Sequence, residues 1–221
     1  MKGARIMEFD KLREVIGDYQ QLDFAKGAIE LALYCAEALD ADGLGKEHWQ
    51  TVPLDRNRQA PNNNAPDDPR RPSLERRARC YDLVLDSLET FENKIASGDD
   101  AAERVRAHAY ELAFASTDEI FHSQLYEWLI SRGLADELLE VRESHFYCSI
   151  NSGSFIAMQM RPSYLQAYLQ CEPRTHDKYQ LLWQFYVKDG QPLRAAEVLA
   201  TLAESSECVP LDGSCCLFLS P

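Results

Sequence analysis

Apolar side chains recur at helical spacing along most of this 221-residue chain. Positions three or four residues apart share one face of an α-helix, whereas a half-buried strand alternates apolar and polar residues. A clean alternation of useful length is missing outside two irregular segments, residues 142–160 and 208–221. The pattern therefore predicts an all-α fold.

The N-terminal part of the chain predicts two antiparallel helices. The first spans about residues 5–17, and Gly17 with Asp18 predicts its end. The second spans about residues 20–40 and carries a stripe of small apolar residues that permits a close approach between helices. Together they predict a helical hairpin.

Residues 42–72 break the helical pattern. They hold half of the ten prolines, the run Asn62–Asn64 and few large apolar side chains. Such a composition buries too little apolar surface to offset the entropy of ordering. We therefore expect a disordered loop here, outside the core.

Three further helices are predicted before residue 133. One spans about residues 73–97, with Ser73 placed to cap its N-terminus. Another begins at the acidic pair Asp99 and Asp100, which suits the positive end of the helix dipole. A third opens at Ser116, whose spacing to Glu119 matches a capping box.

Two helix ends read as copies of one unit, LYEWLISRG ending at Gly133 and LWQFYVKDG ending at Gly190. Glycine after a helix supplies the left-handed residue, and each copy is followed by a second apolar helix. The pattern predicts stacked antiparallel helix pairs, an α-solenoid. The matched packing positions are Leu125, Tyr126, Trp128 and Gly133 in the first copy, and Leu182, Trp183, Phe185 and Gly190 in the second.

The two copies lie 57 residues apart, which exceeds the period of about 34–47 residues of a two-helix repeat. Residues 142–160 hold two charged residues and no helical stripe, and their removal brings the spacing to 38. We therefore predict a helical solenoid over residues 1–207, interrupted at 142–160 by an insertion or a retained intron. Residues 208–221 form an irregular tail outside the solenoid pattern.

Composition and charge exclude several classes of partner. Lys and Arg number 23 against 36 Asp and Glu, giving a net charge of −13 that argues against binding nucleic acid or an anionic membrane surface. Apolar runs fall short of the ~18 residues that a membrane span needs, and no secretory signal is legible. A reducing compartment is the resulting expectation.

Seven cysteines fit that expectation. Cys35, Cys80 and Cys171 stand alone in helical runs and are expected to pack as small apolar side chains. The spacing of Cys and His matches no zinc motif, so no metal site is predicted. The remaining four lie in the irregular segments: Cys148, Cys208, Cys215 and Cys216.

The sequence offers weak candidates for catalysis. Common phosphate-binding, nucleophile-elbow and zinc-protease motifs are missing. The acidic cluster of Asp99, Asp100 and Glu103 faintly resembles a magnesium site, and Asp118 with His122 could form a dyad. Acidic residues at helix N-termini explain both patterns more simply, so we predict no enzyme, no catalytic residue and no cofactor.

Five stretches of the chain, in order, resemble the C-terminal solenoid of the large non-repetitive, WGA-negative nucleoporins of the nuclear pore inner ring. They cover about residues 6–206, with the break at 142–160. The resemblance adds Tyr164 and Leu165, within a Pro-x-Tyr-Leu passage, to the packing positions. The stretches are DYQQLDFAKGAIELALYCAEALD, RRARCYDLVLDSLETFE, IFHSQLYEWLISRGLADELLE, PSYLQAYL and YQLLWQFYVKDGQPLRAAEVLATLAES.

This resemblance implies a structural scaffold component of the nuclear pore complex, located at the nuclear envelope. It implies other nucleoporins as partners, including linear motifs of linker nucleoporins, and it assigns no partner-binding residue here. A helical-repeat adaptor or coat-like protein unrelated to the pore stays as the alternative, with an all-α magnesium enzyme more remote. In a pore scaffold and in an adaptor alike, Trp128 and Trp183 are expected to pack in the core between helical repeats.

Overall fold

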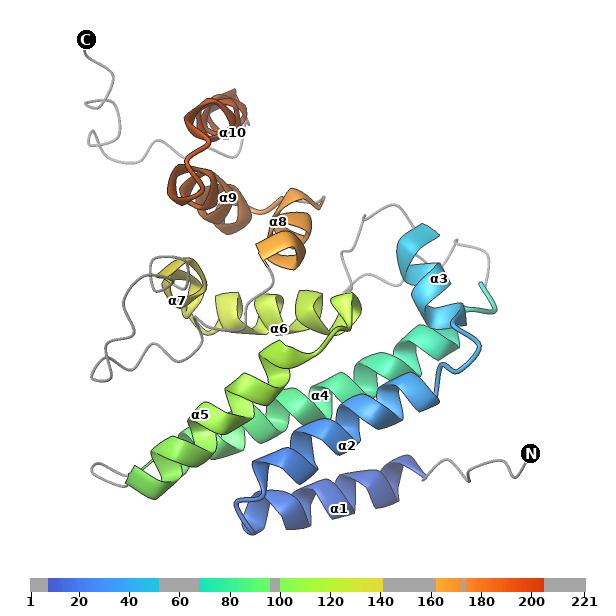
Figure 1. Cartoon of the computed structure of the whole chain (residues 1–221). Helices are drawn as coiled ribbons and strands as arrows, with labels where there is room; N and C mark the ends of the chain where they lie inside the picture. The colour runs from blue at the N-terminus through green and yellow to red at the C-terminus, as the bar shows by residue number, and fades with distance from the viewer. Residues whose placement is uncertain (1–7, 52–67, 96–99, 141–161, 172–173, 205–221) are drawn as a thin grey trace.

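The computed structural model describes residues 8–51, 68–95, 100–140, 162–171 and 174–204. Within these ranges every regular element is an α-helix, as the apolar spacing predicts (Figure 1). The predicted insertion at 142–160 and the tail from 208 lie outside the described residues. The helices are α1 (Phe9–Gln21), α2 (Ala25–Ala38), α3 (Leu44–Thr51), α4 (Arg71–Asn93), α5 (Asp100–Ala115), α6 (Glu119–Ser131), α7 (Ala135–Glu140), α8 (Pro162–Gln170), α9 (His176–Lys188) and α10 (Pro192–Glu204).

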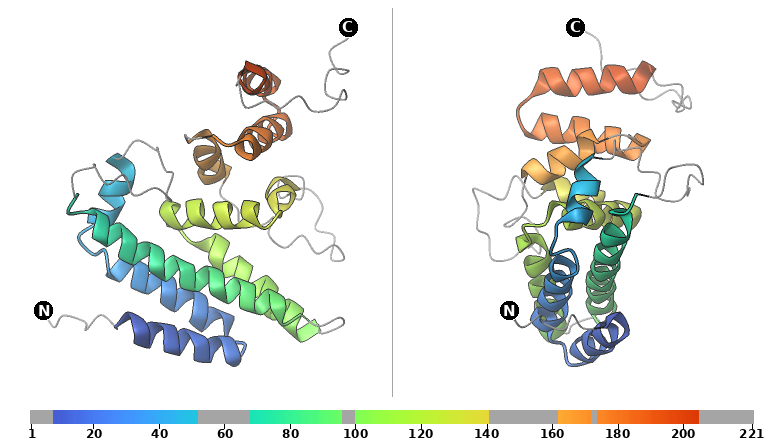
Figure 2. Two further views of the ribbon diagram at one scale, coloured as in Figure 1. Left: turned by 180° about the vertical axis from the view of Figure 1, so that it is seen from behind. Right: turned by 90° about the vertical axis from the view of Figure 1, so that its right-hand side faces the viewer.

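The helices form a stack that lengthens in chain order (Figures 1 and 2). Helices α1, α2, α4 and α5 pack alongside one another at the N-terminal end, where α2 contacts the other three. Helix α6 contacts α4 and α8, and α9 lies between α8 and α10. Consecutive layers share buried apolar side chains, which is the organisation of an α-solenoid.

The predicted hairpin of α1 and α2 is present, but the first helix is longer than expected. It runs through Gly17 and Asp18 to Gln21, because its buried face, including Leu12 and Ile16, outweighs the cost of about 1 kcal/mol for an internal glycine. The chain then reverses at Asp23, which has a φ of 55°.

The prediction of a loop over residues 42–72 is wrong at both of its ends. Residues 44–51 form α3, which packs on α4, and α4 already begins at Arg71; residues 52–67 lie outside the described ranges. Glycine at position 45 allows α3 to approach α4 closely, because a Cβ there would lie only 2.8 Å from the backbone nitrogen of Leu74. Ser73 does not cap α4, because it is buried inside the helix and Arg70 holds the N-cap position.

The capping of α6 also differs from the prediction. Asp118 is its N-cap and accepts a hydrogen bond from the Ile120 N–H at 3.1 Å, while Ser116 accepts one from the Asp118 N–H at 3.2 Å. At the other end, Gly133 has a φ of 76°, and Gly190 after α9 has a φ of 69°. Both glycines therefore take the left-handed conformation that reverses the chain.

Candidate functional site

A buried charged network joins three helices at the N-terminal end of α6. Arg77 of α4 is 6% exposed and donates three hydrogen bonds. Its Nη1 lies 2.7 Å from Asp40 Oδ2, its Nη2 lies 2.8 Å from Asp118 Oδ2, and its Nε lies 2.6 Å from Tyr81 Oη. The Tyr81 hydroxyl in turn donates to Asp118. We call these four residues the Arg77 network.

Both carboxylates of the Arg77 network also serve a helix N-terminus. Asp40 follows α2 and accepts the backbone N–H groups of Gly45 and Lys46, at 2.8 and 3.1 Å, in the first turn of α3. Asp118 accepts the backbone N–H of Ile120 in the first turn of α6. The network therefore ties the turn between α2 and α3 to α4 and to the start of α6.

Burial and hydrogen bonding set the pKa values in this network. Desolvation is the largest influence on the Asp40 carboxyl, but hydrogen bonds from Gly45, Arg77 and Lys46 outweigh it and lower the pKa below its usual value. Desolvation opposes the charged form of Arg77, yet Asp118 and Tyr81 raise its pKa further. Burial, followed by the negative charge of Asp118, raises the pKa of the Tyr81 hydroxyl. Tyr81 is consequently a neutral donor at pH 7.

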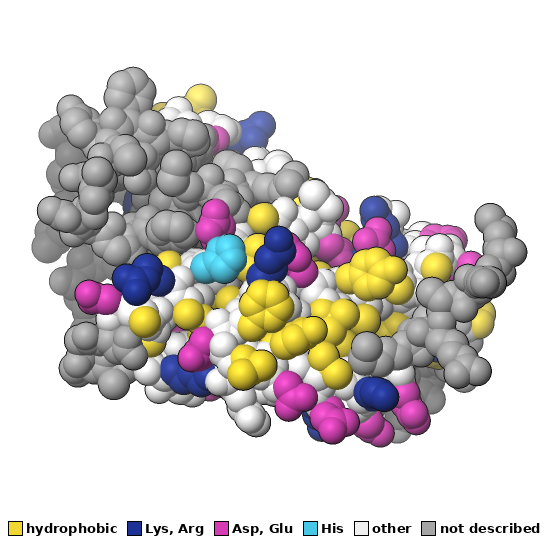
Figure 3. Space-filling model, turned by 60° about the horizontal axis from the view of Figure 1, so that its bottom comes forward, with side chains coloured by type: hydrophobic (Ala, Val, Ile, Leu, Met, Phe, Trp, Pro, Cys, Tyr) yellow, Lys and Arg dark blue, Asp and Glu magenta, His cyan; other side chains and the backbone are white. Residues whose placement is uncertain are grey.

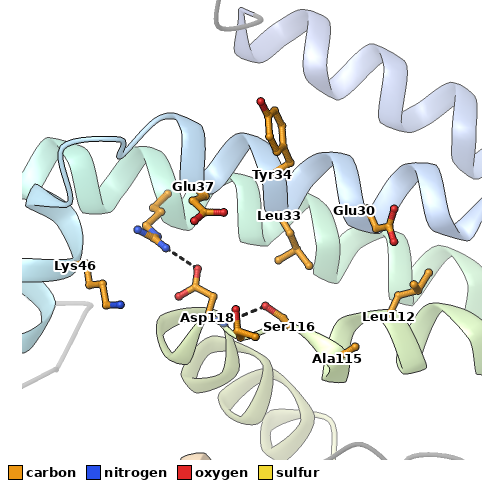
Figure 4. A pocket seen from close by; sticks show the side chains of 11 residues that line it. Glu30, Leu33, Tyr34, Glu37, Lys46, Leu112, Ala115, Ser116 and Asp118 are labelled. Carbon is orange, nitrogen blue, oxygen red and sulfur yellow. Dashed lines mark hydrogen bonds and ion pairs between the residues drawn. The ribbon is translucent and has the colours of Figure 1, made fainter. Parts of the chain in front are cut away.

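Beside this network lies a groove of about 440 Å³ (Figure 4). We call it the α2–α5 groove, because α2 and α5 form its two walls and the link from α5 to α6 closes one end. Figure 3 shows apolar side chains gathered on the underside of the molecule, among charged ones. The groove is lined by Glu30, Leu33, Tyr34, Glu37, Lys46, Arg77, Leu112, Ala115, Ser116, Thr117 and Asp118.

Two of the three acidic residues suggested by sequence for metal binding lie in the described part of the chain. Asp100 opens α5 at the surface, Glu103 pairs with Arg106, and Asp99 lies outside the described residues. Among the described residues, no group of three or more His, Cys, Asp and Glu side chains is arranged to hold a metal ion. Acidic residues in the first turn of α5 fit the simpler helix-dipole explanation.

The candidate dyad of Asp118 and His122 is not formed. The Asp118 carboxylate is occupied by Arg77, Tyr81 and the Ile120 N–H. The His122 ring is fully buried, and its Nε2 lies 2.8 Å from the carbonyl oxygen of Ser116. Aromatic rings surround it, including Tyr164 with its centroid at 5.2 Å. His122 thus packs the layer between α5, α6 and α8.

The three described cysteines pack as expected of apolar side chains. Cys35 and Cys80 are buried, and burial raises the pKa of both thiols, that of Cys80 to about 11. Cys171 is half-buried, and its Sγ lies 3.0 Å from the carbonyl oxygen of Ala167. A thiol with a raised pKa is a poor nucleophile at neutral pH.

The side chains predicted as packing positions, from the two copies and from the resemblance, divide into two groups by burial. The fully enclosed side chains are Leu125, Tyr126, Leu165, Leu182 and Phe185. Trp128, Trp183 and Tyr164 are half-buried and pack against the edge of the core. Arg132 lies over the Trp128 ring, with its Cζ 4.8 Å from the ring centroid.

Sequence reasoning missed the Arg77 network, although a signal was present. Arg77 occupies the apolar stripe of α4, between Leu74 and Tyr81, where a charged side chain is out of place. A charge in such a position is normally paired with buried acids. Asp40 stands just after α2 and Asp118 just before α6, both at helix boundaries that bring them to α4.

Among the described residues, the helices are too short or too polar to cross a membrane.

Comparisons with relatives agree with the fold. The curated sequences include a probable nucleoporin of Schizosaccharomyces pombe, 28% identical over 203 residues, and nucleoporin NUP170 of Chaetomium thermophilum, 27% identical over 202 residues. These matches cover 91% and 88% of this chain but only 13% and 12% of the relatives. The chain thus spans about an eighth of the length of the curated relatives that it matches.

Solved structures of Chaetomium thermophilum Nup170 share the helical arrangement. The complex of the Nup170 CTD with Nup145N is 26% identical, with a TM-score of 0.64, over 90% of this chain and 34% of that one. The Nup170 SOL structure is 29% identical, with a TM-score of 0.62, over 90% of this chain and 22% of that one. The family described as non-repetitive/WGA-negative nucleoporin C-terminal matches residues 1–217. The chain therefore belongs to the non-repetitive/WGA-negative nucleoporins and corresponds to part of their C-terminal helical region.

Proposed function

We propose that this chain is a non-catalytic scaffold segment of the nuclear pore complex inner ring, located at the nuclear envelope and supporting nucleocytoplasmic transport. The observation that carries the proposal is the family match over residues 1–217, together with a helical stack similar to that of Nup170. Stacked helices bury a continuous core and present long surfaces, which suit a structural role.

Other nucleoporins are the proposed partners of this scaffold. One similar structure is a complex between the Nup170 CTD and Nup145N, which supports binding of another nucleoporin by this kind of helical region. We propose linear motifs of linker nucleoporins among these partners. Direct contact with nucleic acid or anionic membranes is not proposed, because the net charge is −13.

Localisation of the tagged chain tests the proposal. A fluorescent protein fused to the chain at its chromosomal locus should give a punctate nuclear rim that coincides with a known inner-ring nucleoporin. A helical adaptor outside the pore would instead give a diffuse or vesicular signal. Nuclear-envelope fractions should retain the chain after soluble nucleoplasmic proteins are washed out, and its loss in that wash would contradict the proposal.

The domain boundaries are proposed separately. We propose a solenoid over residues 1–207 with an insertion or retained intron at 142–160, and a distinct tail at 208–221. The family match reaches residue 217 and so includes most of residues 208–221. Transcript reads that continue from codon 207 into further helical coding sequence would support a tail distinct from the solenoid. Reads that join codon 141 to codon 161 would support the intron, whereas an abundant tryptic peptide spanning residues 143–174, which contains this segment, would exclude it.

A further inference from the structure

Helix α2 presents two different faces along its length. Its alanine-rich face is buried against α1, α4 and α5. The opposite stripe, formed by Glu30, Leu33, Tyr34 and Glu37, recurs at spacings of three and four residues and lines the α2–α5 groove. This second stripe places two apolar side chains between two carboxylates.

The apolar part of the stripe is open to solvent. Tyr34 is 66% exposed and Leu33 is half-buried on α2, while Leu112 and Ala115 line the facing wall on α5 (Figure 4). A tyrosine on a groove wall offers a large, rigid contact surface at a small entropic cost. This part of the groove can therefore receive one large apolar side chain.

The electrostatics of the groove favour a basic partner. Asp118 and the buried Asp40 are both paired with Arg77, so Glu30 and Glu37 are the lining carboxylates that remain for a partner. Glu30 has a long, exposed contact with Lys26, at 4.0 Å, which contributes little to stability and can be exchanged for a partner cation. Helices α2 and α5 both end beside the groove, and neither has a basic residue in its last turn. The N-termini of α3 and α6 also lie beside the groove, at Lys46 and Asp118, so their positive dipole ends offset the negative ends of α2 and α5. The preference for a basic partner therefore comes from Glu30 and Glu37, on a chain whose net charge is −13.

We propose that the α2–α5 groove binds a linear segment of a partner protein in which one large apolar residue is flanked by lysine or arginine residues. The apolar side chain packs on Leu33, Tyr34 and Leu112, and the flanking cations pair with Glu30 and Glu37. This inference rests on the proposed function, because it takes the partner to be another component of the pore scaffold.

Spacing defines the motif further. Glu30 and Glu37 are seven residues apart on one helix, which corresponds to a rise of about 10.5 Å. In an extended peptide, side chains at positions i, i+2 and i+4 point to one side and span about 13 Å. The flexible stems of Lys and Arg accommodate the difference, so the expected motif is basic-x-apolar-x-basic.

Synthetic peptides test the proposal with the complete 221-residue chain. Fluorescein-labelled twelve-residue peptides with the cores Arg-Ser-Leu-Ser-Arg, Glu-Ser-Leu-Ser-Glu and Arg-Ser-Ser-Ser-Arg are titrated by fluorescence anisotropy. The first peptide should bind at least about tenfold more tightly than the other two, because only it satisfies both the apolar wall and the carboxylates. Equal binding of all three, binding of none, or a preference for the acidic peptide would overturn the proposal.

Matched variants locate the binding site. Tyr34→Ala and Glu37→Lys should each weaken binding of the first peptide by about tenfold, and the exposure of Tyr34 allows its substitution without unfolding. Leu193→Ala, which removes an 81% exposed side chain from α10, and Glu14→Lys on the exposed side of α1 are the controls and should leave affinity unchanged. Equal losses in the controls would contradict placement in the groove.

Two further outcomes separate this inference from alternatives. Sedimentation equilibrium that shows a dimer, lost in Tyr34→Ala, would assign the groove to a second copy of the chain and overturn the proposal. A chain that binds the peptide but never reaches the nuclear rim would contradict the proposed function while leaving the groove's specificity intact. A chain at the rim that binds none of the peptides would refute the groove alone.

Discussion

Replacing Arg77 by methionine tests whether the Arg77 network stabilises the fold. Methionine keeps much of the apolar stem but removes the guanidinium, so the Asp40 carboxylate, whose side chain is 1% exposed, loses its cation. Removing one partner of a buried ion pair costs about 3–5 kcal/mol, because the remaining charge stays desolvated. For a chain of this length, the melting temperature should fall by about 6–20 °C.

The matched control is Arg76→Met, one position earlier on α4. Arg76 is exposed, and its guanidinium donates one hydrogen bond to Ser73 Oγ within the same helix, so its loss should cost about 0.5–1.5 kcal/mol, less than the loss of Arg77. Urea titration followed by circular dichroism at 222 nm measures the free energy of unfolding of both variants. Equal, small losses in Arg76→Met and Arg77→Met would refute the role of the buried charge.

A double-mutant cycle identifies the cause of the loss. Asp40→Asn keeps an acceptor for the α3 backbone but removes the charge that Arg77 neutralises. In the Arg77→Met background, the asparagine should recover part of the lost stability, with a coupling of about 0.5–3 kcal/mol. Strict additivity would show that the two side chains act independently.

Three further predictions concern pH, packing and the turns. Because the pKa of Asp40 is lowered in the folded chain, its contribution to stability is complete above about pH 4 and is lost as the pH falls through the folded-state pKa. The difference in unfolding free energy between the unaltered chain and Asp40→Asn should therefore become smaller on acidification. A difference that becomes larger would contradict this sign. Tyr126→Ala should cost about 3–5 kcal/mol, and Trp128→Ala less, because Tyr126 is fully enclosed and Trp128 is half-buried; urea titration giving the reverse order would refute the packing described above. Gly133→Ala should destabilise the chain by about 1–2 kcal/mol, because alanine is strained at the positive φ of this position. Gly17→Ala should stabilise it by about 0.5–1 kcal/mol, because Gly17 lies inside α1 with open space around it. Melting temperatures that both rise or both fall would disprove this backbone explanation.

The helical class and the turns could be predicted because they depend on local chemistry. Apolar spacing of three and four residues indicates a helix wherever its buried face lies, and Gly133 and Gly190 mark turns that need a positive φ. The helix end predicted at Gly17 is wrong because a local pattern takes no account of tertiary burial. The burial of Leu12 and Ile16 extends α1 past this glycine.

Helix α3 and the partners of Arg77 could not be derived from local patterns, although the position of Arg77 in the apolar stripe of α4 indicates that it is paired. Helix α3 has eight residues and a low apolar content, and it is held by non-local features, the Asp40 cap and the contact of Gly45 with α4. The α2–α5 groove likewise combines residues more than seventy positions apart. Such sites depend on how helices pack, which a single sequence states only indirectly.

Crosslinking and affinity purification of the chromosomally tagged chain from nuclear envelopes tests the central claim most directly. The account predicts that mass spectrometry recovers inner-ring nucleoporins as the dominant crosslinked partners. Recovery of a purely cytosolic set of partners, with no nucleoporin crosslinked, would contradict the assignment of this chain as a pore scaffold segment.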